Sequence, residues 1–398
     1  MPEKISRPIS AQATTLRILL VSRFCPSKAH AGGLRMLDIY ALIKQRLPAV
    51  QLDLYTHHRP DIDWTIAEAY QIFDNVYLSP TEELSPSGLA TLRSEANQYD
   101  VIDVQYHQRG LHLGGFRQLG KKLIFTPMES RALAFWTSLR ALFGMRGKFN
   151  LKNIPADLYY TYQEISYCFK ADEVVCVSNT DSEFLRAVTR SKQVRVLETG
   201  LSTFEFSAAL SQREFDVAPE KKAMHIVYVA AFGSETNVAA LRWYLDNVHP
   251  IVKSAVPDYV LDVVGRGDLS SFSRYQDASV NFVGEVAELA PCIARARVGI
   301  APALGGSGFR GKVNQYAILG VPGVVSPIAL HGLVYEDGIN IFAAESPQLF
   351  AQRCIQLLTD AALNARMGTA ARKLCLGRYT WASKWKTICE IYNLQGVE

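Results

Sequence analysis

The sequence lacks the cysteine patterns typical of disulfide-rich and zinc-binding proteins. Its seven cysteines are an odd number, lie far apart and include no C-x-x-C pair. A disulfide framework and a structural zinc site are therefore poor interpretations. Reduced thiols in a cytoplasmic protein are the better prediction, because disulfides are rare in that compartment.

The chain also lacks the segments that direct a protein into or through a membrane. Its first residues show no positively charged stretch followed by an apolar run, so no secretory signal is predicted. Residues 313–335 contain no Lys, Arg, Asp or Glu, and this segment is long enough to span a bilayer. It holds two prolines and three glycines, however, which predict a helix, a turn, a strand and a loop inside a domain.

The composition that is present predicts a globular protein of two domains. The chain has 398 residues, of which 48% are hydrophobic and 20% are charged, and a domain usually has about 100 to 200 residues. The net charge of +4 is mildly basic and suits an anionic substrate or an acidic surface. No nucleic-acid partner is expected.

Apolar runs predict two series of strands, separated by a polar stretch at residues 202–222. The first series covers residues 16–24, 50–55, 101–106, 123–126, 173–177 and 194–199, and the second covers 225–231, 259–264, 280–283, 298–304, 323–326 and 340–343. Strands that are apolar on both faces and alternate with helices predict parallel sheets covered on both sides. The expected fold class is therefore α/β, with two doubly wound, Rossmann-like domains. In the second domain, a helix is expected from Asn237, its predicted N-cap, to residue 253.

The feature that points most directly to a function is a glycine-rich turn at residues 305–312, with the sequence GGSGFRGK. It lies between a predicted strand and a short predicted helix. Glycines let the backbone approach a ligand, and a helix start presents unpaired N–H groups to an anion. Arg310 and Lys312 add two positive charges. The turn therefore predicts a diphosphate site; the alternative is an ordinary turn with solvated cations.

The same turn nearly matches the phosphate-binding loop of nucleoside triphosphatases. Gly306, Gly311 and Lys312 fit the pattern G-x-x-x-x-G-K. Val313 follows them, however, where that motif has Ser or Thr to hold magnesium. A triphosphatase would thus lack its metal ligand.

A second group of candidate residues lies at predicted strand ends in the first half. Gly32 and Gly33 precede Arg35 at a strand-to-helix junction, His107 follows the strand 101–106, and Glu129 follows the strand 123–126. The carboxyl ends of parallel strands meet at one edge of a sheet, where ligands bind. These residues either line a site there or are structural, and the sequence leaves both interpretations open.

Residues 131–152 form a basic stretch rich in aromatic and aliphatic side chains. Such a stretch could contact an anionic membrane surface peripherally. The alternative is a helix that packs on its own sheet and leaves its cations in water.

Three segments, taken together, resemble glycosyltransferase family 4 of the GT-B architecture. They are ADEVVCVS at residues 171–178, VYVAAFG at 227–233 with Asn237, and residues 298–325. The sequence YTW at 379–381 is also similar to the start of the family's last helix. The resemblance covers almost the whole chain and is strongest across residues 225–330.

The resemblance implies two Rossmann-like domains that face a cleft. Residues 1–205 would form the acceptor domain, 206–222 a linker, 223–376 the donor-binding domain, and 377–398 a helix that packs back on the first domain. The implied activity is the transfer of a sugar, with retention, from a nucleotide-diphosphate sugar to a polysaccharide, a lipid-linked glycan or a small molecule. Neither a metal nor another cofactor is expected.

The resemblance also assigns roles to individual residues. The implied catalytic residues are His107, Arg310 and Lys312. The implied donor-binding residues are Gly233, Ser234, Arg266, Ser307, Gly308 and Gln315. The implied acceptor-side residues are Gly32, Gly33, Arg35 and Glu129.

Two departures from the family's pattern concern charge near the sugar. The family commonly has two glutamates in the region aligned with Ser307 and Gln315, and both residues here are neutral.

Asp61 and Asp63 resemble the D-x-D metal site of another glycosyltransferase architecture. Arg59 and Pro60 interrupt the approach to them, however, and a solvated turn is the better interpretation. A nucleotide-sugar epimerase and a catalytically silent nucleotide-sugar binder remain alternative functions.

Overall fold

A computed structural model describes residues 4–6, 16–28, 31–57, 67–79, 92, 99–106, 113–136, 154–190, 193–211, 222–305 and 311–395 of the chain. The chain divides into two compact units. The first comprises Met1–Thr199 and Lys384–Glu398, and the second comprises Gly200–Ser383.

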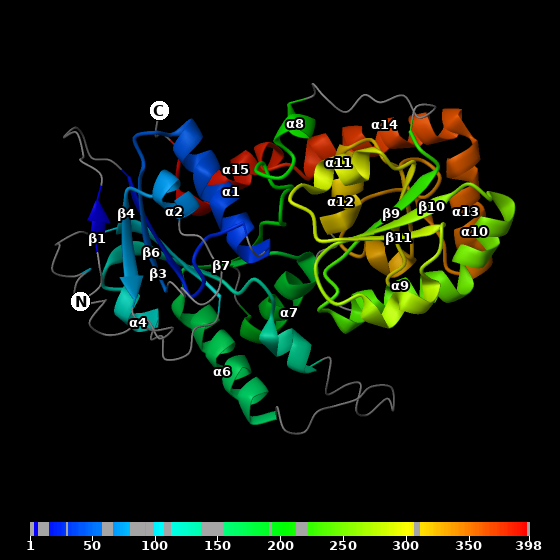
Figure 1. Ribbon diagram of the computed structural model, residues 1–398. Helices are drawn as coiled ribbons and strands as arrows, with labels where there is room; N and C mark the ends of the chain where they lie inside the picture. Colours follow the sequence, from blue (N-terminus) through cyan, green and yellow to red (C-terminus); the bar gives the residue numbers. More distant parts are fainter. Residues whose placement is uncertain are drawn as a thin grey trace. The chain divides into compact units, whose positions relative to one another are not determined.

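The first unit is built on an eight-stranded sheet with the order β1-β4-β3-β2-β5-β6-β7-β8 (Figure 1). Its strands are β1 (Lys4–Ser6), β2 (Arg17–Ser22), β3 (Gln51–His57), β4 (Asn75–Ser79), β5 (Tyr99–Gln105), β6 (Gly120–Thr126), β7 (Glu173–Cys176) and β8 (Val194–Val196). Only β1 pairs in the antiparallel direction among these strands. Its helices are α1 (Ala31–Arg46), α2 (Ala67–Ile72), α4 (Leu113–Phe116), α6 (Ile154–Lys170), α7 (Asn179–Thr189) and α15 (Trp385–Tyr392).

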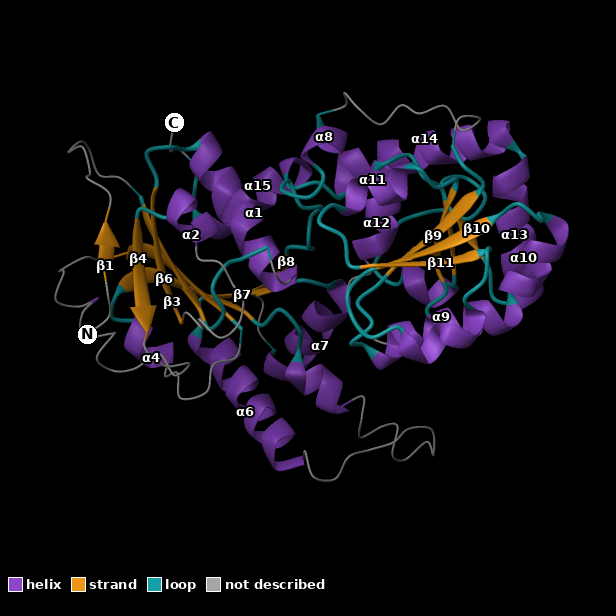
Figure 2. Cartoon of the chain, in the orientation of Figure 1, coloured by secondary structure: helices purple, strands orange, loops and turns teal. Residues whose placement is uncertain are grey.

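Helices cover both faces of this sheet, as its two-sided apolar strands require. The helices α1, α2 and α15 lie on one face, and α4, α6 and α7 lie on the other (Figure 2). The second face carries a core cluster that includes Leu19, Phe116, Tyr167 and Leu185.

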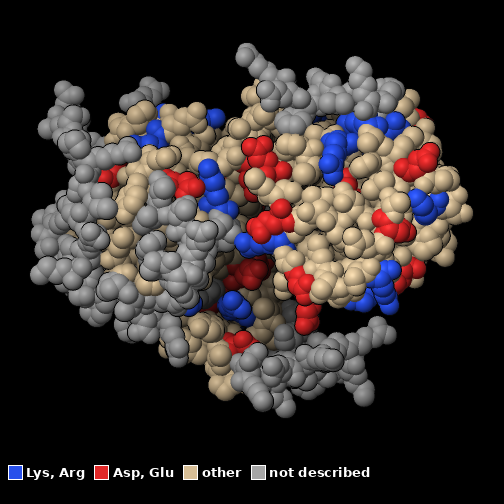
Figure 3. Space-filling view, viewed as in Figure 1, with Lys and Arg blue, Asp and Glu red and all other residues tan. Residues whose placement is uncertain are grey.

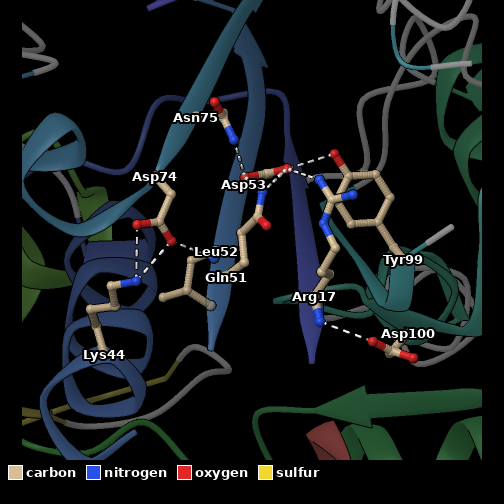
Figure 4. Close-up of polar contacts among 9 residues, drawn as sticks. All are labelled: Arg17, Lys44, Gln51, Leu52, Asp53, Asp74, Asn75, Tyr99 and Asp100. Atoms are coloured by element: carbon tan, nitrogen blue, oxygen red, sulfur yellow. Dashed lines mark hydrogen bonds and ion pairs between the residues drawn. The ribbon is translucent and has the colours of Figure 1, made fainter. Parts of the chain in front are cut away.

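The middle of this sheet also holds a buried carboxylate, Asp53 of β3, which is fully buried. Its oxygens accept hydrogen bonds from the Tyr99 hydroxyl at 2.8 Å, the Asn75 amide at 2.8 Å and the Arg17 guanidinium at 3.1 Å (Figure 4). A buried charge is tolerated only when it is paired and hydrogen-bonded. These bonds therefore fix the relative positions of β2, β3, β4 and β5.

The C-terminal helix α15 belongs to the first unit, beside α1 (Figure 1). Its Tyr392 hydroxyl donates a hydrogen bond of 2.6 Å to Asp103 of β5, and the Tyr40 hydroxyl of α1 donates another of 2.9 Å. Arg46 of α1 stacks over the Trp385 ring at 4.8 Å from its centroid. The last helix thus returns to the first sheet.

The second unit is built on a six-stranded parallel sheet with the order β11-β10-β9-β12-β13-β14. Its strands are β9 (His225–Val229), β10 (Val260–Val264), β11 (Val280–Gly284), β12 (Val298–Ala301), β13 (Gly323–Val325) and β14 (Phe342–Ala343). Its α-helices are α8 (Ser207–Leu210), α9 (Glu235–Asn247), α10 (His249–Ala255), α11 (Leu289–Ala294), α12 (Gly311–Ile318), α13 (Pro347–Thr359) and α14 (Ala361–Arg378). Its short 3₁₀ helices are η3 (Ser270–Tyr275) and η4 (Pro327–Leu330), while η5 (Ala382–Lys384) lies where the chain returns to the first unit.

Two apolar clusters fill the two sides of this sheet. One packs α9, α10 and α13 on the strands, with Leu241, Val252 and Phe350 buried in it. The other packs α8, α11, α12 and α14, with Ala209 and Ile318 buried in it. Two Rossmann-like units, each with its own core, confirm the predicted fold class.

The structure differs from the sequence prediction at two places in the second unit. The helix expected from Asn237 begins at Glu235 with Ser234 as N-cap, and it breaks at Val248 because Pro250 has no N–H for the helical ladder. Part of the expected linker, 206–222, is ordered here: Phe206 and Ala209 are buried in the core that includes α12 and α14. Apolar contacts, which the polar composition of this stretch hides, hold α8 in place.

No helix in the described part of the chain is long and apolar enough to cross a membrane. The uncharged segment 313–335 folds as most of α12, then β13 and η4 with their connections. On the face drawn in Figure 3, acidic and basic side chains of the second unit are interspersed.

Candidate functional site

The candidate donor site lies at the carboxyl ends of β9 and β12 in the second unit. Lys312, in the first turn of α12, is half-buried. Its Nζ lies 4.5 Å from the centroid of the Tyr228 ring and 3.4 Å from Oδ1 of Asn237. An aromatic face and an amide oxygen both attract this cation.

Tyr316 fixes the position of α12 against these strands. Its buried hydroxyl accepts a hydrogen bond from the Val229 N–H at 3.1 Å and donates one to the Ile300 carbonyl at 3.0 Å, so it joins β9 to β12. The ring lies over Gly299, where an added Cβ would overlap it. Glycine in the middle of β12 therefore lets the helix carrying Lys312 approach the sheet.

A narrow cavity opens beside Lys312. It is lined by Tyr228, Thr236, Asn237, Ala240, Ala301, Pro302, Ala303, Gly305, Lys312 and Ala329. Apart from Lys312, the side chains that line it in the described part of the chain carry no charge, so the charge at this opening is positive.

The neighbouring loops at this edge are held by glycines with positive φ. Gly265 has φ +139° and Gly267 has φ +124°. A Cβ on Gly265 would overlap the Ala230 carbonyl oxygen, and one on Gly267 would lie 2.9 Å from the carbonyl carbon of Phe232. Only glycine allows the loops after β9 and β10 to approach this closely.

The structure brings several of the predicted donor residues to this edge. Arg266 is exposed and its carbonyl accepts a hydrogen bond from the Phe232 N–H at 2.8 Å. Ser234 caps α9, and Gly233 is exposed beside it with open space at its Cβ position. Gln315 is half-buried, three residues after Lys312 on α12.

Three other predicted residues of this site, Ser307, Gly308 and Arg310, lie outside the described residues. Their roles on the donor, like those of Gly233, Ser234, Arg266 and Gln315, stay predictions.

The predicted acceptor-side residues gather at the carboxyl ends of β2, β5 and β6 in the first unit. Gly32 is the second residue of α1, and an added Cβ there would overlap the Tyr106 hydroxyl and lie 3.1 Å from Cε of Met128. Tyr106 directly follows β5 and Met128 is the second residue after β6, and they have φ of 66° and 59°. Glu129 is exposed next to Met128. We call Gly32, Tyr106, Met128 and Glu129 the first-unit rim, in which the side chains of Tyr106 and Met128 pack on Gly32.

Arg35 and Gly33 lie deeper than an acceptor-binding rim requires. Gly33 is buried. Arg35 is 1% exposed, and its guanidinium donates to the Leu197 carbonyl at 2.7 Å and to Oγ1 of Thr199 at 3.3 Å. Burial lowers the pKa of Arg35 to about 10, while the nearby Tyr392, Asp103 and Tyr106 act in the opposite direction, so the group stays charged at neutral pH.

These two hydrogen bonds join α1 to Leu197 and Thr199, which follow β8. The acceptor-side role of Arg35 stays a prediction. The predicted catalytic residue His107 lies outside the described residues, as do Asp61 and Asp63 of the D-x-D sequence.

Within the described ranges, no group of three or more His, Cys, Asp or Glu residues could hold a metal ion. Metal independence stays a prediction. All seven cysteines are free, and burial raises the pKa of the Cys25 thiol to about 12. A thiol of this kind is protonated at neutral pH and is a poor nucleophile.

Sequence reasoning missed Tyr228, Tyr106 and Met128. Tyr228 lies in the strand expected at residues 225–231, and its side chain points toward α9. No residue near it in the sequence indicates that it contacts Lys312. Tyr106 and Met128 each stand one residue before a predicted site residue, and their left-handed backbone has no signal in a single sequence.

Comparison with known proteins gives a family for the second unit. Residues 223–360 match the family model described as "Glycosyl transferases group 1". No curated protein matches the chain.

Solved structures match nearly the whole chain at low identity. A structure of Anabaena HepE in complex with UDP and glucose is 15% identical, covers 95% of this chain and 99% of its own, and has a TM-score of 0.61. A glycosyltransferase from Rickettsia africae is 14% identical, covers 96% and 100%, and has a TM-score of 0.65. WaaG, a glycosyltransferase involved in lipopolysaccharide biosynthesis, is 13% identical, covers 94% and 99%, and has a TM-score of 0.61.

These structural matches establish the fold, while the family model covers the part of the chain that contains Lys312 and its cavity. The second unit, through residues 223–360, is thus similar to the group 1 glycosyl transferases, and the chain as a whole has two Rossmann-like units.

Proposed function

We propose that the protein transfers a sugar, with retention and without a metal ion, from a nucleoside-diphosphate sugar to an acceptor. The observation that carries this proposal is the position of Lys312. It stands at the start of α12 beside an otherwise uncharged cavity, within the segment that matches the family model. A cation at this place suits a diphosphate.

The chemistry follows from the charge that develops on the leaving group. When the bond between the sugar's anomeric carbon and the diphosphate oxygen breaks, negative charge gathers on the diphosphate. Lys312, Arg310 and the N–H groups at the start of α12 would stabilise that charge in place of a metal ion. The acceptor hydroxyl would attack from the same face, and its proton would pass to the departing diphosphate.

This front-face displacement needs no carboxylate nucleophile. Retaining enzymes that use one place two carboxylates about 5 Å apart, and the described lining of the cavity contains none. The neutral Gln315 would bind hydroxyl groups of the donor, with weaker hydrogen bonds than a carboxylate makes.

The first-unit rim would take the acceptor. Glu129 is its exposed charged group, and His107 follows Tyr106 directly in the sequence. The acceptor class we propose is a lipid-linked glycan or a surface polysaccharide, because residues 131–152 are basic and aromatic. Transfer to water-soluble sugars alone, with none to lipid-linked glycans or polysaccharides, would contradict this class.

A panel of nucleoside-diphosphate sugars tests the function, beginning with UDP-glucose because the HepE structures hold UDP and UDP-glucose. The expected products are a free nucleoside diphosphate and a glycosylated acceptor. An altered sugar on an intact nucleotide would mean an epimerase, and binding without turnover would mean a silent binder.

Lys312→Met tests the role of the cation. It keeps the aliphatic stem and removes the charge, so kcat/KM should fall by about 100-fold or more, as on removal of one preorganised group that stabilises transition-state charge. The matched control is Lys373→Met on α14, an exposed lysine that does not line the cavity. A parental rate in Lys312→Met would overturn the proposal.

A further inference from the structure

An exposed apolar stripe runs along α6 in the first unit. Leu158, Tyr159, Tyr162 and Phe169 are 50%, 46%, 74% and 66% exposed, and the half-buried Ile165 lies between the last two. Residues 158, 162, 165 and 169 recur at helical spacing, so they share one face of the helix. We call Leu158, Tyr159, Tyr162 and Phe169 the α6 stripe.

The stripe is not needed to hold α6 on its own sheet. The opposite face does this: Tyr167 is buried and meets Phe125 of β6 edge-on, with 5.2 Å between ring centroids. Glu164 is fully buried, and its carboxylate accepts hydrogen bonds from the Ala132 N–H at 2.7 Å and the Ser130 hydroxyl at 3.2 Å. Large aromatic side chains left exposed in a row on an anchored helix are typical of a contact surface.

The sequence that contains α6 is predominantly basic. Residues 131–170 contain six Lys and Arg but two Asp and Glu, a net charge of +4 that equals the net charge of the entire chain. Of the two acids, Glu164 is buried and Asp157 is half-buried. Arg131 and Lys170 are exposed. The partner that this surface fits is therefore anionic as well as apolar.

We propose that the α6 stripe docks on an anionic lipid surface. Tyrosine, phenylalanine and leucine side chains that project from one helix face suit the boundary between headgroups and acyl chains, and neighbouring lysines and arginines attract acidic headgroups. A second copy of the chain is a poorer occupant, because a two-fold contact would bring this cationic region against itself.

The docking surface is independent of the donor site, since α6 carries none of the residues assigned to sugar transfer. It adds to the predicted contact at residues 131–152, of which 137–152 lie outside the described residues. Mutations in the stripe should therefore change membrane binding and leave transfer to a water-soluble acceptor unchanged.

Vesicle flotation tests the proposal with the full chain. We expect flotation with vesicles of phosphatidylcholine and phosphatidylglycerol in equal parts, and little or none with phosphatidylcholine alone. Binding should weaken as salt is raised, because salt screens the attraction of exposed cations. The double variant Tyr162→Ser/Phe169→Ser should lower the partition coefficient at least tenfold.

The control is Phe204→Ser, which removes an aromatic side chain that is 37% exposed in the second unit. Thermal unfolding curves of the parent and the double variant should coincide, because Tyr162 and Phe169 are largely exposed. Absence of the parent protein from anionic vesicles, or equal flotation of the double variant, would overturn the proposal. So would a dimer in light scattering that the double variant converts to a monomer.

Discussion

The two units build the edges that carry their candidate sites from different materials. In the second unit, main chain packs on main chain, as Gly265 and Gly267 meet the carbonyl groups of Ala230 and Phe232. In the first unit, Gly32 meets the side chains of Tyr106 and Met128. A main-chain contact leaves no room for adjustment, whereas a side chain can move by changing its rotamer.

This difference suits the roles proposed for the two units. A donor diphosphate is a constant chemical group, and a rigid edge positions it. Acceptors vary in shape, and an edge made of side chains can be altered one residue at a time. The family model accordingly covers residues 223–360, in the second unit, and not the first-unit rim.

The two units also differ in how they hold a buried ionisable side chain. In the first unit, Asp103 accepts hydrogen bonds from four side chains, which are those of Tyr40, Gln105, Thr126 and Tyr392. In the second unit, burial lowers the pKa of Lys222 to about 8.

The largest effect is expected from Gly265→Ala. The new Cβ would overlap the Ala230 carbonyl, and alanine strongly disfavours φ +139°. We expect a loss of about 3 to 5 kcal/mol in the free energy of unfolding, measured in urea. Gly284→Ala is the matched control, since Gly284 also has positive φ (+75°) but open space around it. Equal losses in the two variants would show that strain alone, and not main-chain contact, sets the second unit's edge.

Lys222→Met should stabilise the protein below pH 8. The folded-state pKa of about 8 lies below the usual 10.5, so the unfolded chain binds more protons between these values and wild-type stability rises with pH there. Below pH 8 the buried charge costs up to about 3 kcal/mol, a cost that methionine removes. Urea titrations at pH 7 and pH 11 measure the change. If Lys222→Met raised the free energy of unfolding equally at pH 7 and pH 11, the gain would not come from removing the buried charge.

Tyr392→Phe should destabilise the first unit by about 2 kcal/mol, because it removes one hydrogen bond to a buried carboxylate. Burial raises the pKa of Asp103 above its usual 3.8 despite its four donors. The contribution of the Asp103 carboxyl to the free energy of unfolding is therefore greatest in acid, and it falls as pH rises from 3.8 through the raised pKa. The loss in Tyr392→Phe should accordingly shrink at low pH, where Asp103 is protonated. A pH-independent loss would point to packing alone.

The smallest effect is expected from Gly32→Ala. The new Cβ would meet the far end of a flexible side chain, with Cζ of Tyr106 at 2.7 Å. Because this side chain can move, we expect a loss of about 1 kcal/mol in the free energy of unfolding. Adding Tyr106→Phe should restore part of it, because the hydroxyl is the atom most crowded. A loss as large as in Gly265→Ala would remove the difference between the two edges.

The sequence predicted much of the fold because its signals are local. Apolar runs located most of the strands, and the glycine-rich turn indicated a helix after it, although Gly311 and Lys312, predicted to belong to the turn, are the first two residues of α12. It did not predict β4, a five-residue strand after a mixed segment, or the break at Val248. For the candidate sites, the sequence pointed to Lys312 and Gly32, whose roles stay predictions. It did not point to Tyr228 or Tyr106, whose partners lie far away in the chain.

The sequence by itself determined two apolar, alternating series of strands and helices and a cationic, glycine-rich junction, since each depends on neighbours within a few residues. Only the tertiary structure decided that Tyr392 would bind Asp103, 289 residues away, that Tyr106 would fill the space beside Gly32, and that α6 would keep its aromatic stripe exposed. Such contacts depend on which faces meet after the chain has folded, and the physical reason is that burial and hydrogen bonding act through space and not along the sequence.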